Sequence, residues 1–372
     1  MKTNFFPMPA EEKLAGEQRF FVTRGSKISY TWNERPARLT PALSDEWRSW
    51  IAENLILGAT AEDVAAQLRQ HLQIPVAAGM REIGIALNSP YLKGARRLRN
   101  RLEKRDWLLN IPSQLSKLSP IDIPRRARLT TEDFLRDHYA TNRPVIITGM
   151  LDDCSALTKW TLDWLESQFG DRTVEVQLGR NADENYELNS IAHKREMSFG
   201  EYVRMIRTCK KTNDFYMTAN NDSRNREALS ELWLDVPRLP EYLSPSRVGE
   251  GFFWFGPAGT VTPFHHDLTN NFMMQIAGRK RIRLIAPWDT PKLQNHRHCF
   301  TPVDGRHIDF NRFPVMQDVA VIDCVLAPGE ILFLPVGWWH FVEAMEISIT
   351  VAATNFRWDN EFVKNYPEAH DF

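Results

Sequence analysis

The sequence predicts an antiparallel β-sandwich or small barrel that follows a helical module. From Gly251 onward, short runs of strand-forming residues alternate with the turn sequences GPAG and APGE, which is typical of antiparallel sheets. Before about residue 110, apolar residues instead recur at helical spacing. The segment Ile111–Pro124 holds three prolines and separates the two patterns, so we expect it to link the two parts.

The N-terminal part is predicted to be helical after an extended leader at residues 1–40. Ser44 and Thr60 are suited to cap the first two helices, because their hydroxyls can accept from free backbone N–H groups. A third helix is predicted over residues 80–87, and a fourth begins at Pro90. We therefore expect an N-terminal helical module over residues 1–120.

The remainder, residues 121–372, is predicted to form a mainly β domain with flanking helices. Ser198 with Glu201 is a capping-box pattern before the amphipathic segment Phe199–Ile206. Strands are expected in the segments RPVIITGM, GFFWF, NFMMQIAG, RKRIRLIAP, AVIDCVL, EILFLP and EISITVAATNF.

Composition excludes several classes of protein. Among the 372 residues, 46 Lys and Arg balance 47 Asp and Glu, for a net charge of −1. A globally basic protein that binds nucleic acid is therefore not expected. The four cysteines form no CxxC pair, which argues against a zinc ribbon or a disulfide framework. The N-terminus lacks the apolar region of a secretory signal, and no 18-residue apolar stretch occurs. We expect a cytoplasmic protein without membrane contact.

The sequence TVTPFHHDLTNNF carries the first candidate site residues. On a strand, His265 and Asp267 leave the same face because they are two residues apart. His340 closes GWWH after a later predicted strand. Two imidazoles and one carboxylate suit a facial iron site with open positions, although zinc accepts a similar set. The alternative is a solvated loop histidine beside an aspartate, because an isolated HxD is common by chance.

Lys280 supports a site for a dicarboxylate. Strand alternation in GRKRIRLI places Lys280 on the face of Ile282 and Leu284, which indicates that the lysine points inward. A buried ammonium needs an anion, and the distal carboxylate of 2-oxoglutarate would supply one. Thr262, three residues before His265, is a candidate hydroxyl donor to the same carboxylate. The alternative is a lysine that reaches solvent at the strand end.

Asn355 ends the last predicted strand. The same alternation places it on one face with Ile347, Ile349, Val351 and Ala353, which we interpret as an interior row. A buried amide needs partners, and a metal-bound cosubstrate is one candidate. An asparagine satisfied by backbone groups at the strand end is the alternative.

Taken in order, these motifs resemble those of the JmjC-type cupin oxygenases. The shared pattern is TPFHHD with Asn271-Phe272, then QIAGRKR, PGEIL and WWH. Within that class the sequence is similar to the asparaginyl hydroxylase family of factor inhibiting hypoxia-inducible factor and its bacterial cupin-like relatives. The resemblance covers roughly residues 124–356.

The resemblance implies a double-stranded β-helix, or jelly-roll, core and a 2-oxoglutarate-dependent dioxygenase. Iron(II) would be held by His265, Asp267 and His340, with O2 as the second cosubstrate. The distal carboxylate of 2-oxoglutarate would be held by Lys280, Thr262 and Tyr216, and the part nearer the metal by Asn271 and Asn355. No catalytic residue beyond the metal site is implied.

Three functions remain open. The first is hydroxylation of a C–H bond on a peptide or protein side chain, which the hydroxylase motifs favour by analogy. The second is removal of an N-methyl group from lysine or arginine, and the third is a metal-binding cupin without oxygenase activity. The sequence shows no counterpart of that family's C-terminal helical pair, which makes its dimer, so the family's dimer is not carried over and the oligomeric state stays open.

Two further clusters are assigned no site. The basic run Lys93–Arg105 is interpreted as a solvated helix face, with an acidic peptide or RNA as the alternative. The histidines of NHRHCF fit no standard zinc spacing.

Overall fold

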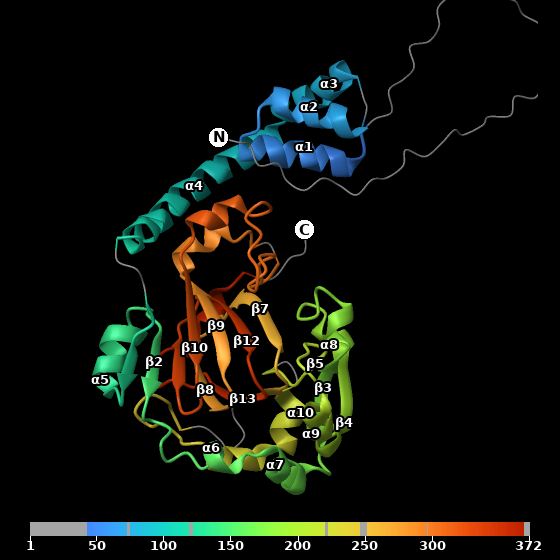
Figure 1. Cartoon of the computed structure of the whole chain (residues 1–372). Helices are drawn as coiled ribbons and strands as arrows, with labels where there is room; N and C mark the ends of the chain where they lie inside the picture. Colours follow the sequence, from blue (N-terminus) through green and yellow to red (C-terminus); the bar gives the residue numbers. More distant parts are fainter. Residues whose placement is uncertain are drawn as a thin grey trace, which may run out of the picture. The chain divides into compact units, whose positions relative to one another are not determined.

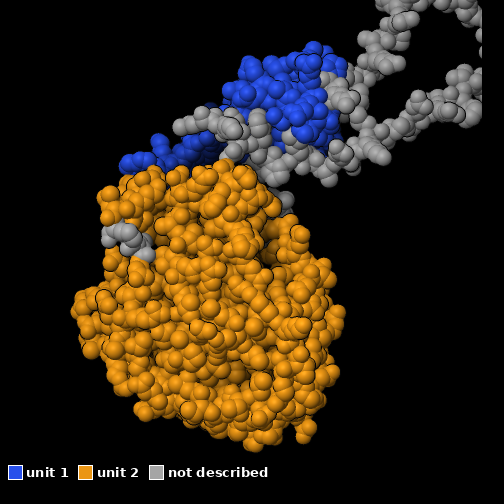
Figure 2. Space-filling view, in the orientation of Figure 1, with its two compact units in different colours: residues 1–108 blue, residues 109–372 orange. Residues whose placement is uncertain are grey.

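A computed structural model describes residues 43–72, 75–118, 122–219, 222–245, 251–295 and 297–367. The chain divides into two compact units, residues 1–108 and 109–372 (Figure 2). The expected leader at residues 1–40 lies outside the described residues. The domain boundary placed after residue 120 stays a prediction. Within the described part of the chain, no helix is long and apolar enough to cross a membrane.

The first unit is built from helices around a small apolar core. Its elements are α1 (Asp45–Leu57), α2 (Ala61–Leu72), α3 (Val76–Asn88) and the start of α4 (Pro90–Ser116). The expected caps are confirmed, because Ser44 accepts from the backbone N–H of Trp47 and Thr60 accepts from that of Asp63. The core contains Trp50, Ile51, Leu55, Val64, Leu68 and Ile83. Burial of this apolar stripe stabilises helices that are individually short.

Two arginines of the basic run make contacts at the end of α1. Arg96 donates to the carbonyl oxygen of Leu55 at 3.1 Å, and Arg99 donates to that of Ile56. Carbonyl groups in the last turn of a helix lack N–H partners within that helix, and the arginines add donors there beside the N–H of Gly58, which also contacts the Leu55 carbonyl. Part of the basic run therefore has a structural role in the first unit.

The prediction of a linker at Ile111–Pro124 is wrong over its first half. Residues 111–116 belong to α4, which contains Pro112. The hydroxyl of Ser113 donates to Asp289 at 2.8 Å and accepts from Lys292 at 2.9 Å. Proline removes one helical hydrogen bond, but these contacts hold the last turn of the helix.

The second unit is organised around two β-sheets. The six-stranded sheet has the order β1-β2-β11-β8-β13-β6, and the four-stranded sheet has the order β10-β9-β12-β7 (Figure 1). The first sheet comprises β1 (Arg125–Ala127), β2 (Val145–Thr148), β11 (Ile331–Leu334), β8 (Asn271–Ala277), β13 (Ser348–Ala353) and β6 (Phe252–Gly256). The second comprises β10 (Val321–Leu326), β9 (Lys280–Ile285), β12 (Trp339–Ala344) and β7 (Val261–His266). The expected strands are confirmed, and the two sheets form the predicted jelly-roll core.

Three apolar layers surround these sheets. The layer between the sheets includes Met273, Ile282, Leu284, Leu332 and Val342. A second layer covers the outer face of the six-stranded sheet, where helices pack. A third covers the outer face of the four-stranded sheet. Inner strands of the six-stranded sheet, such as β11 and β13, are therefore buried on both faces.

A small sheet with the order β4-β3-β5 lies beside β7 (Figure 1). It consists of β3 (Thr173–Leu178), β4 (Lys194–Ser198) and β5 (Phe215–Tyr216). The helices of this unit are α5 (Thr131–Phe134), α6 (Ala156–Lys159), α7 (Leu162–Phe169), α8 (Ser190–His193), α9 (Phe199–Thr208) and α10 (Asp222–Ala228). The capping box is confirmed at its first bond, since Ser198 accepts from the N–H of Glu201.

Candidate metal centre

His265, Asp267 and His340 meet at one end of the four-stranded sheet. Strands β7 and β12 are antiparallel neighbours, and His265 lies directly opposite His340 in their register. Asp267 follows the last residue of β7. The ligand atoms of all three residues lie within 4.8 Å of one another. The structure thus brings together the three residues that the sequence predicts as metal ligands.

The distances between these groups leave room for a shared cation. Nε2 of His265 is 3.7 Å from Oδ1 of Asp267, and Nε2 of His340 is 4.0 Å from Oδ2 of the same carboxylate. The two imidazole centroids are 4.0 Å apart. Each Nε2 therefore faces the carboxylate from a separate strand, as coordination of one ion requires.

Backbone carbonyls fix the tautomer of both histidines. Nδ1 of His265 lies 2.8 Å from the carbonyl oxygen of Pro263, and Nδ1 of His340 lies 3.0 Å from that of Trp338. A carbonyl oxygen only accepts, so each Nδ1 carries the proton and each Nε2 keeps its lone pair. This arrangement is typical of histidines prepared for a metal.

Burial keeps His340 neutral. Desolvation, followed by the neighbouring His265, lowers the pKa of His340 far below its usual 6.5. The imidazole therefore stays unprotonated at neutral pH. A neutral imidazole is the form that coordinates a cation, so the electrostatics agree with the hydrogen-bond geometry.

Lys280 lies inside the core, as predicted. Lys280 is 2% exposed, and its Nζ donates to the hydroxyl oxygen of Tyr216 at 3.1 Å. Desolvation by burial lowers the pKa of Lys280 from 10.5 to about 7. The interior row is confirmed by Ile282 and Leu284, which belong to the layer between the sheets. Lys280 and Tyr216, 64 residues apart in the chain, thus share one buried site.

Thr262 reaches the interior through an irregularity in β7. A regular strand would place Thr262 and His265 on opposite faces, since they are three residues apart. The register with β12 shifts between His340 and Val342, so that Thr262 lies opposite Val342. Val342 belongs to the interior layer, and directly paired residues share a face. The β-bulge thereby turns Thr262 toward the face that carries His340.

Asn271 holds the carboxylate of the candidate metal site. Its Nδ2 donates to Oδ2 of Asp267 at 3.2 Å, while its Oδ1 is buried and has no partner among the described residues. Asn271 is the first residue of β8. The side chain therefore restrains Asp267 and presents a free acceptor close to the same centre.

The interpretation of the last strand as an interior row is wrong. Ile349, Val351 and Ala353 pack in the layer outside the six-stranded sheet, whereas Thr350 lies opposite the buried Gln275. Asn355 lies beyond the end of β13, and its Nδ2 donates to the carbonyl oxygen of Ser244 at 2.7 Å. Since both faces of β13 are buried, alternation alone could not identify the interior one.

A buried ion pair beside Tyr216 escaped the sequence analysis. Nη2 of Arg180 lies 2.7 Å from Oε1 of Glu187, and these side chains are 0% and 5% exposed. Gln177 lies opposite Tyr216 in the register of β3 with β5 and is also fully buried. Arg180 and Glu187 lie outside the strands, where no periodic signal marks burial. A buried charge in a loop cannot be recognised without its tertiary partner.

A groove of about 500 Å³ is lined in part by Pro263, two residues before His265, and by Phe300, whose ring contacts that of His265. Its lining includes Tyr186, Glu187, Val261, Pro263, Phe300 and Arg306. The ring of Phe300 stacks on His265 with 5.6 Å between centroids. The groove therefore reaches the edge of the candidate metal centre and has the size of a ligand site.

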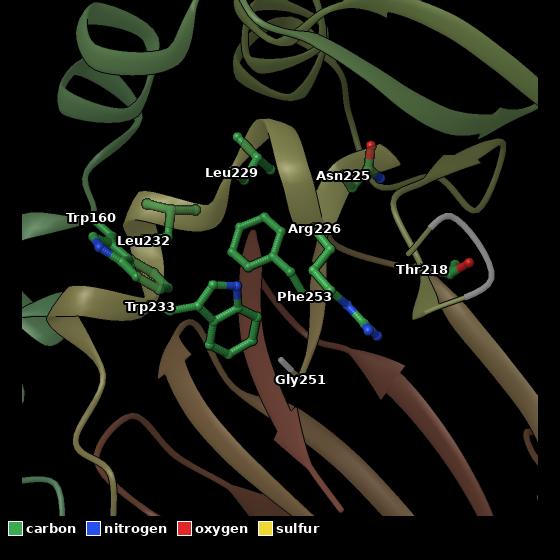
Figure 3. Close-up of a pocket in the computed structure, with 9 residues that line it drawn as sticks. All are labelled: Trp160, Thr218, Asn225, Arg226, Leu229, Leu232, Trp233, Gly251 and Phe253. Carbon is green, nitrogen blue, oxygen red and sulfur yellow. The ribbon is translucent and has the colours of Figure 1, made fainter. Parts of the chain in front are cut away.

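A second cavity is separate from this centre. It measures only about 10 Å³ and is lined by aromatic residues such as Trp160, Trp233 and Phe253 (Figure 3). Phe253 packs in the layer outside the six-stranded sheet. None of the eight predicted site residues lines it, and its volume suits about one water molecule.

Known proteins of similar sequence indicate the family of this chain. A family model described as a cupin-like domain matches residues 131–364. Lysine-specific demethylase JMJ30 of Arabidopsis thaliana is 33% identical over 275 residues, covering 70% of this chain and 61% of that protein. Lysine-specific demethylase 8 of Xenopus tropicalis is 33% identical over 240 residues, covering 62% and 52%. tRNA wybutosine-synthesizing protein 5 of Gallus gallus is 27% identical over 266 residues, covering 68% and 80%.

The matches to the two demethylases leave large parts of those proteins uncovered, since this chain spans 61% and 52% of their lengths. The similarity to the asparaginyl hydroxylase family stays a prediction.

Proposed function

The chain belongs to the cupin-like family, whose JmjC enzymes use Fe(II), 2-oxoglutarate and O2, and we propose on this premise that it hydroxylates a C–H bond of a peptide or protein side chain. Iron would be held by His265, Asp267 and His340. The observation that carries the proposal is the convergence of these ligands with a buried lysine in the same core.

The donor set fits a divalent iron. Two neutral imidazoles with free Nε2 atoms and one carboxylate match the facial triad of non-haem iron oxygenases. When bound there, iron would supply the oxidative chemistry that couples decarboxylation of 2-oxoglutarate to oxidation of the substrate. Asn271 would hold Asp267 in place, since its amide already donates to that carboxylate.

The distal carboxylate of 2-oxoglutarate would lie against Lys280, Tyr216 and Thr262. A buried ammonium with a pKa near 7 gains its proton fully when an anion arrives. The Tyr216 hydroxyl accepts from the lysine and also has a hydrogen bond with the Thr260 side chain. A phenol hydroxyl can donate its own proton to a carboxylate. These contacts favour a dicarboxylic oxo-acid over a monocarboxylic one.

A peptide or protein substrate would enter through the groove beside His265. The groove offers aromatic surface at Phe300 and Tyr186 and exposed charged groups at Glu184 and Arg312. These groups suit an extended polypeptide with both apolar and charged side chains.

Demethylation of an N-methyl-lysine or N-methyl-arginine is the second candidate. Two relatives carry the name lysine-specific demethylase, which favours this reaction as much as the motifs favour simple hydroxylation. Both reactions begin with oxidation of a C–H bond. They differ in whether the oxidised carbon remains or leaves as formaldehyde.

The deciding experiment loads the purified chain with Fe(II) and 2-oxoglutarate without oxygen and then admits air in the presence of candidate peptides or lysate proteins. Gain of one oxygen atom by mass spectrometry, with succinate release, supports hydroxylation. Loss of a methyl group with formaldehyde supports demethylation. Absence of succinate would leave a metal-binding cupin.

A matched pair of variants makes this result specific. Asp267→Ala removes a proposed ligand and should abolish succinate release. Asp323→Ala removes an exposed carboxylate that pairs with Arg281 on the outer face of β9 and should leave turnover unchanged.

A further inference from the structure

Arg180 is a fully buried cation next to the proposed cosubstrate site. It follows Gly179, which adopts the left-handed conformation at the end of β3 (φ 73°), and its backbone N–H donates to Asp214 at 3.0 Å. Its Nη2 contacts Oε1 of Glu187 at 2.7 Å and the carbonyl oxygen of Val261 at 2.8 Å. These contacts hold the guanidinium in one orientation.

That orientation places the guanidinium against two tyrosine rings. Its central carbon lies 4.3 Å from the ring centroid of Tyr186 and 5.2 Å from that of Tyr216. Nε and Nη1 have no hydrogen-bond partner among the described residues. Only Nη2 is therefore held by hydrogen bonds, and unsatisfied buried donors are destabilising. Stacking on the rings is the contact that remains.

The ring of Tyr216 is also confined from other directions. A Cβ added to Gly256 would lie 2.5 Å from Cδ2 of Tyr216, so the ring packs directly on the backbone of β6. The ring of Trp254 lies 5.8 Å away between centroids. With Arg180 as a further neighbour, the phenol has little freedom to turn, and its hydroxyl meets Nζ of Lys280 at 3.1 Å.

We propose that Arg180, anchored by Glu187, is a positioning residue that holds the Tyr216 phenol against Lys280 and thereby sets the affinity of the site for the distal carboxylate of a 2-oxo dicarboxylic acid. The proposal rests on the proposed function of the same site. Arg180 acts through Tyr216 and need not touch the cosubstrate.

A purely structural ion pair would behave differently. Loss of such a pair would weaken every ligand of the site to the same degree, because the fold around it would loosen. A positioning residue for the distal carboxylate affects only ligands that carry that carboxylate. The two roles can be separated with a pair of oxo-acids.

The experiment uses the full chain loaded with Mn(II) and measures binding of 2-oxoglutarate and 2-oxobutyrate by calorimetry. Both acids chelate a metal through the oxo-acid group, but 2-oxobutyrate lacks the distal carboxylate. In Arg180→Met, 2-oxoglutarate should bind about tenfold more weakly, the effect of one misplaced hydrogen bond, while 2-oxobutyrate binds as in the parent. Unchanged 2-oxoglutarate affinity, or an equal loss for both acids, overturns the proposal.

Two further variants distinguish a loss of positioning from misfolding of Arg180→Met. Arg180→Met removes only the cation of a buried ion pair, so Arg180→Met with Glu187→Gln removes both charges at once and should show the same selective loss. Gly256→Ala pushes on Tyr216 from β6 without touching the ion pair and should do likewise. If both variants fold and bind both acids as the parent does, the proposal fails.

A double-mutant cycle tests the route through the phenol. Tyr216→Phe removes the hydroxyl and should itself weaken 2-oxoglutarate. Adding Arg180→Met to that background should cost no further affinity, because the group being positioned is gone. Additive losses would show that Arg180 acts independently of Tyr216.

Failure of the inference is distinguishable from failure of the proposed function. If the parent chain binds neither acid in the presence of Mn(II), the proposed function fails and the inference with it. If the parent binds 2-oxoglutarate more tightly than 2-oxobutyrate and the Arg180 variants keep that preference in full, only the inference fails.

Discussion

The ammonium of Lys280 donates a 3.1 Å hydrogen bond to the hydroxyl oxygen of Tyr216, and both residues are at most 2% exposed. A neutral phenol cannot balance a buried positive charge, so this contact alone leaves Lys280 without a counter-ion. A dicarboxylate beside Lys280 and a metal between the histidines would complete this core.

Lys280→Met should weaken 2-oxoglutarate binding by about tenfold to a hundredfold, the cost of losing a hydrogen bond to a charged group. It should not lower the melting temperature of the ligand-free protein, because it replaces a desolvated ammonium with an apolar chain of similar length. Calorimetry and thermal unfolding measure the two effects.

Arg279→Met is the control for this substitution. Arg279 is the preceding residue, but it is exposed and pairs with Glu346. Both 2-oxoglutarate affinity and stability should change little. Equal losses in the two variants would contradict an interior role for Lys280.

The free energy of unfolding of the ligand-free protein should rise with pH above neutrality. Burial lowers the pKa of Lys280 from 10.5 to about 7 in the folded chain. Between these values the unfolded chain binds a proton that the folded chain has released, so stability increases with pH in this window. Denaturant unfolding of the parent and of Lys280→Met at pH 7, 8 and 9 checks this. The stability of the parent relative to Lys280→Met should rise with pH, and parallel curves would refute this prediction.

Affinity for 2-oxoglutarate should fall as pH rises above about 7. The carboxylate binds the protonated ammonium, so a proton must be taken up with the ligand once Lys280 has deprotonated. We expect a loss of up to about tenfold per pH unit. Calorimetry in buffers of different ionisation enthalpy reports the proton uptake directly. Binding without proton uptake at pH 8.5 would rule this linkage out.

His265→Gln should weaken Fe(II) or Mn(II) binding by more than about a hundredfold, since even residues outside a ligand set cost ten- to a hundredfold. His266→Gln is the matched control. His266 packs edge-on against Trp339, with 4.8 Å between centroids, and lies on the opposite face from its neighbour. Metal content after dialysis and the metal-dependent shift in melting temperature measure the difference. Equal metal loss in both variants would argue against the predicted ligand set.

Asn271→Ala should weaken metal binding about tenfold without abolishing it, because it removes a hydrogen bond to Asp267 and no ligand. The rate of succinate formation at saturating metal should recover a large part of its parental value. Complete loss of metal binding would instead make Asn271 part of the ligand set.

Local alternation predicted much of the candidate site. In a strand, side chains alternate between the two faces with a period of two residues, and this period can be read from the sequence. It places His265 and Asp267 on one face, and it places Lys280 on the inward face of its strand. The helix caps at Ser44 and Ser198 could also be predicted from the sequence, because the donor and the acceptor lie three residues apart.

The same rule failed where the fold overrides local spacing. Thr262 reaches the interior only because β7 contains a bulge. The row that includes Val351 faces the outer layer, because β13 is covered on both sides and its sequence is apolar on both faces. The end of α4 is helical despite Pro112, since Ser113 is held by Asp289 and Lys292.

By itself, the sequence determined the strands, the caps, the spacing of the candidate ligands and the inward direction of one lysine, since each depends on residues a few positions apart. Only the tertiary structure decided which strands lie side by side, so that His340 meets His265 and Tyr216 meets Lys280. It also decided that Arg180 lies behind that phenol. These relationships join distant parts of the chain, and they arise from the burial of shared apolar layers that no local pattern encodes.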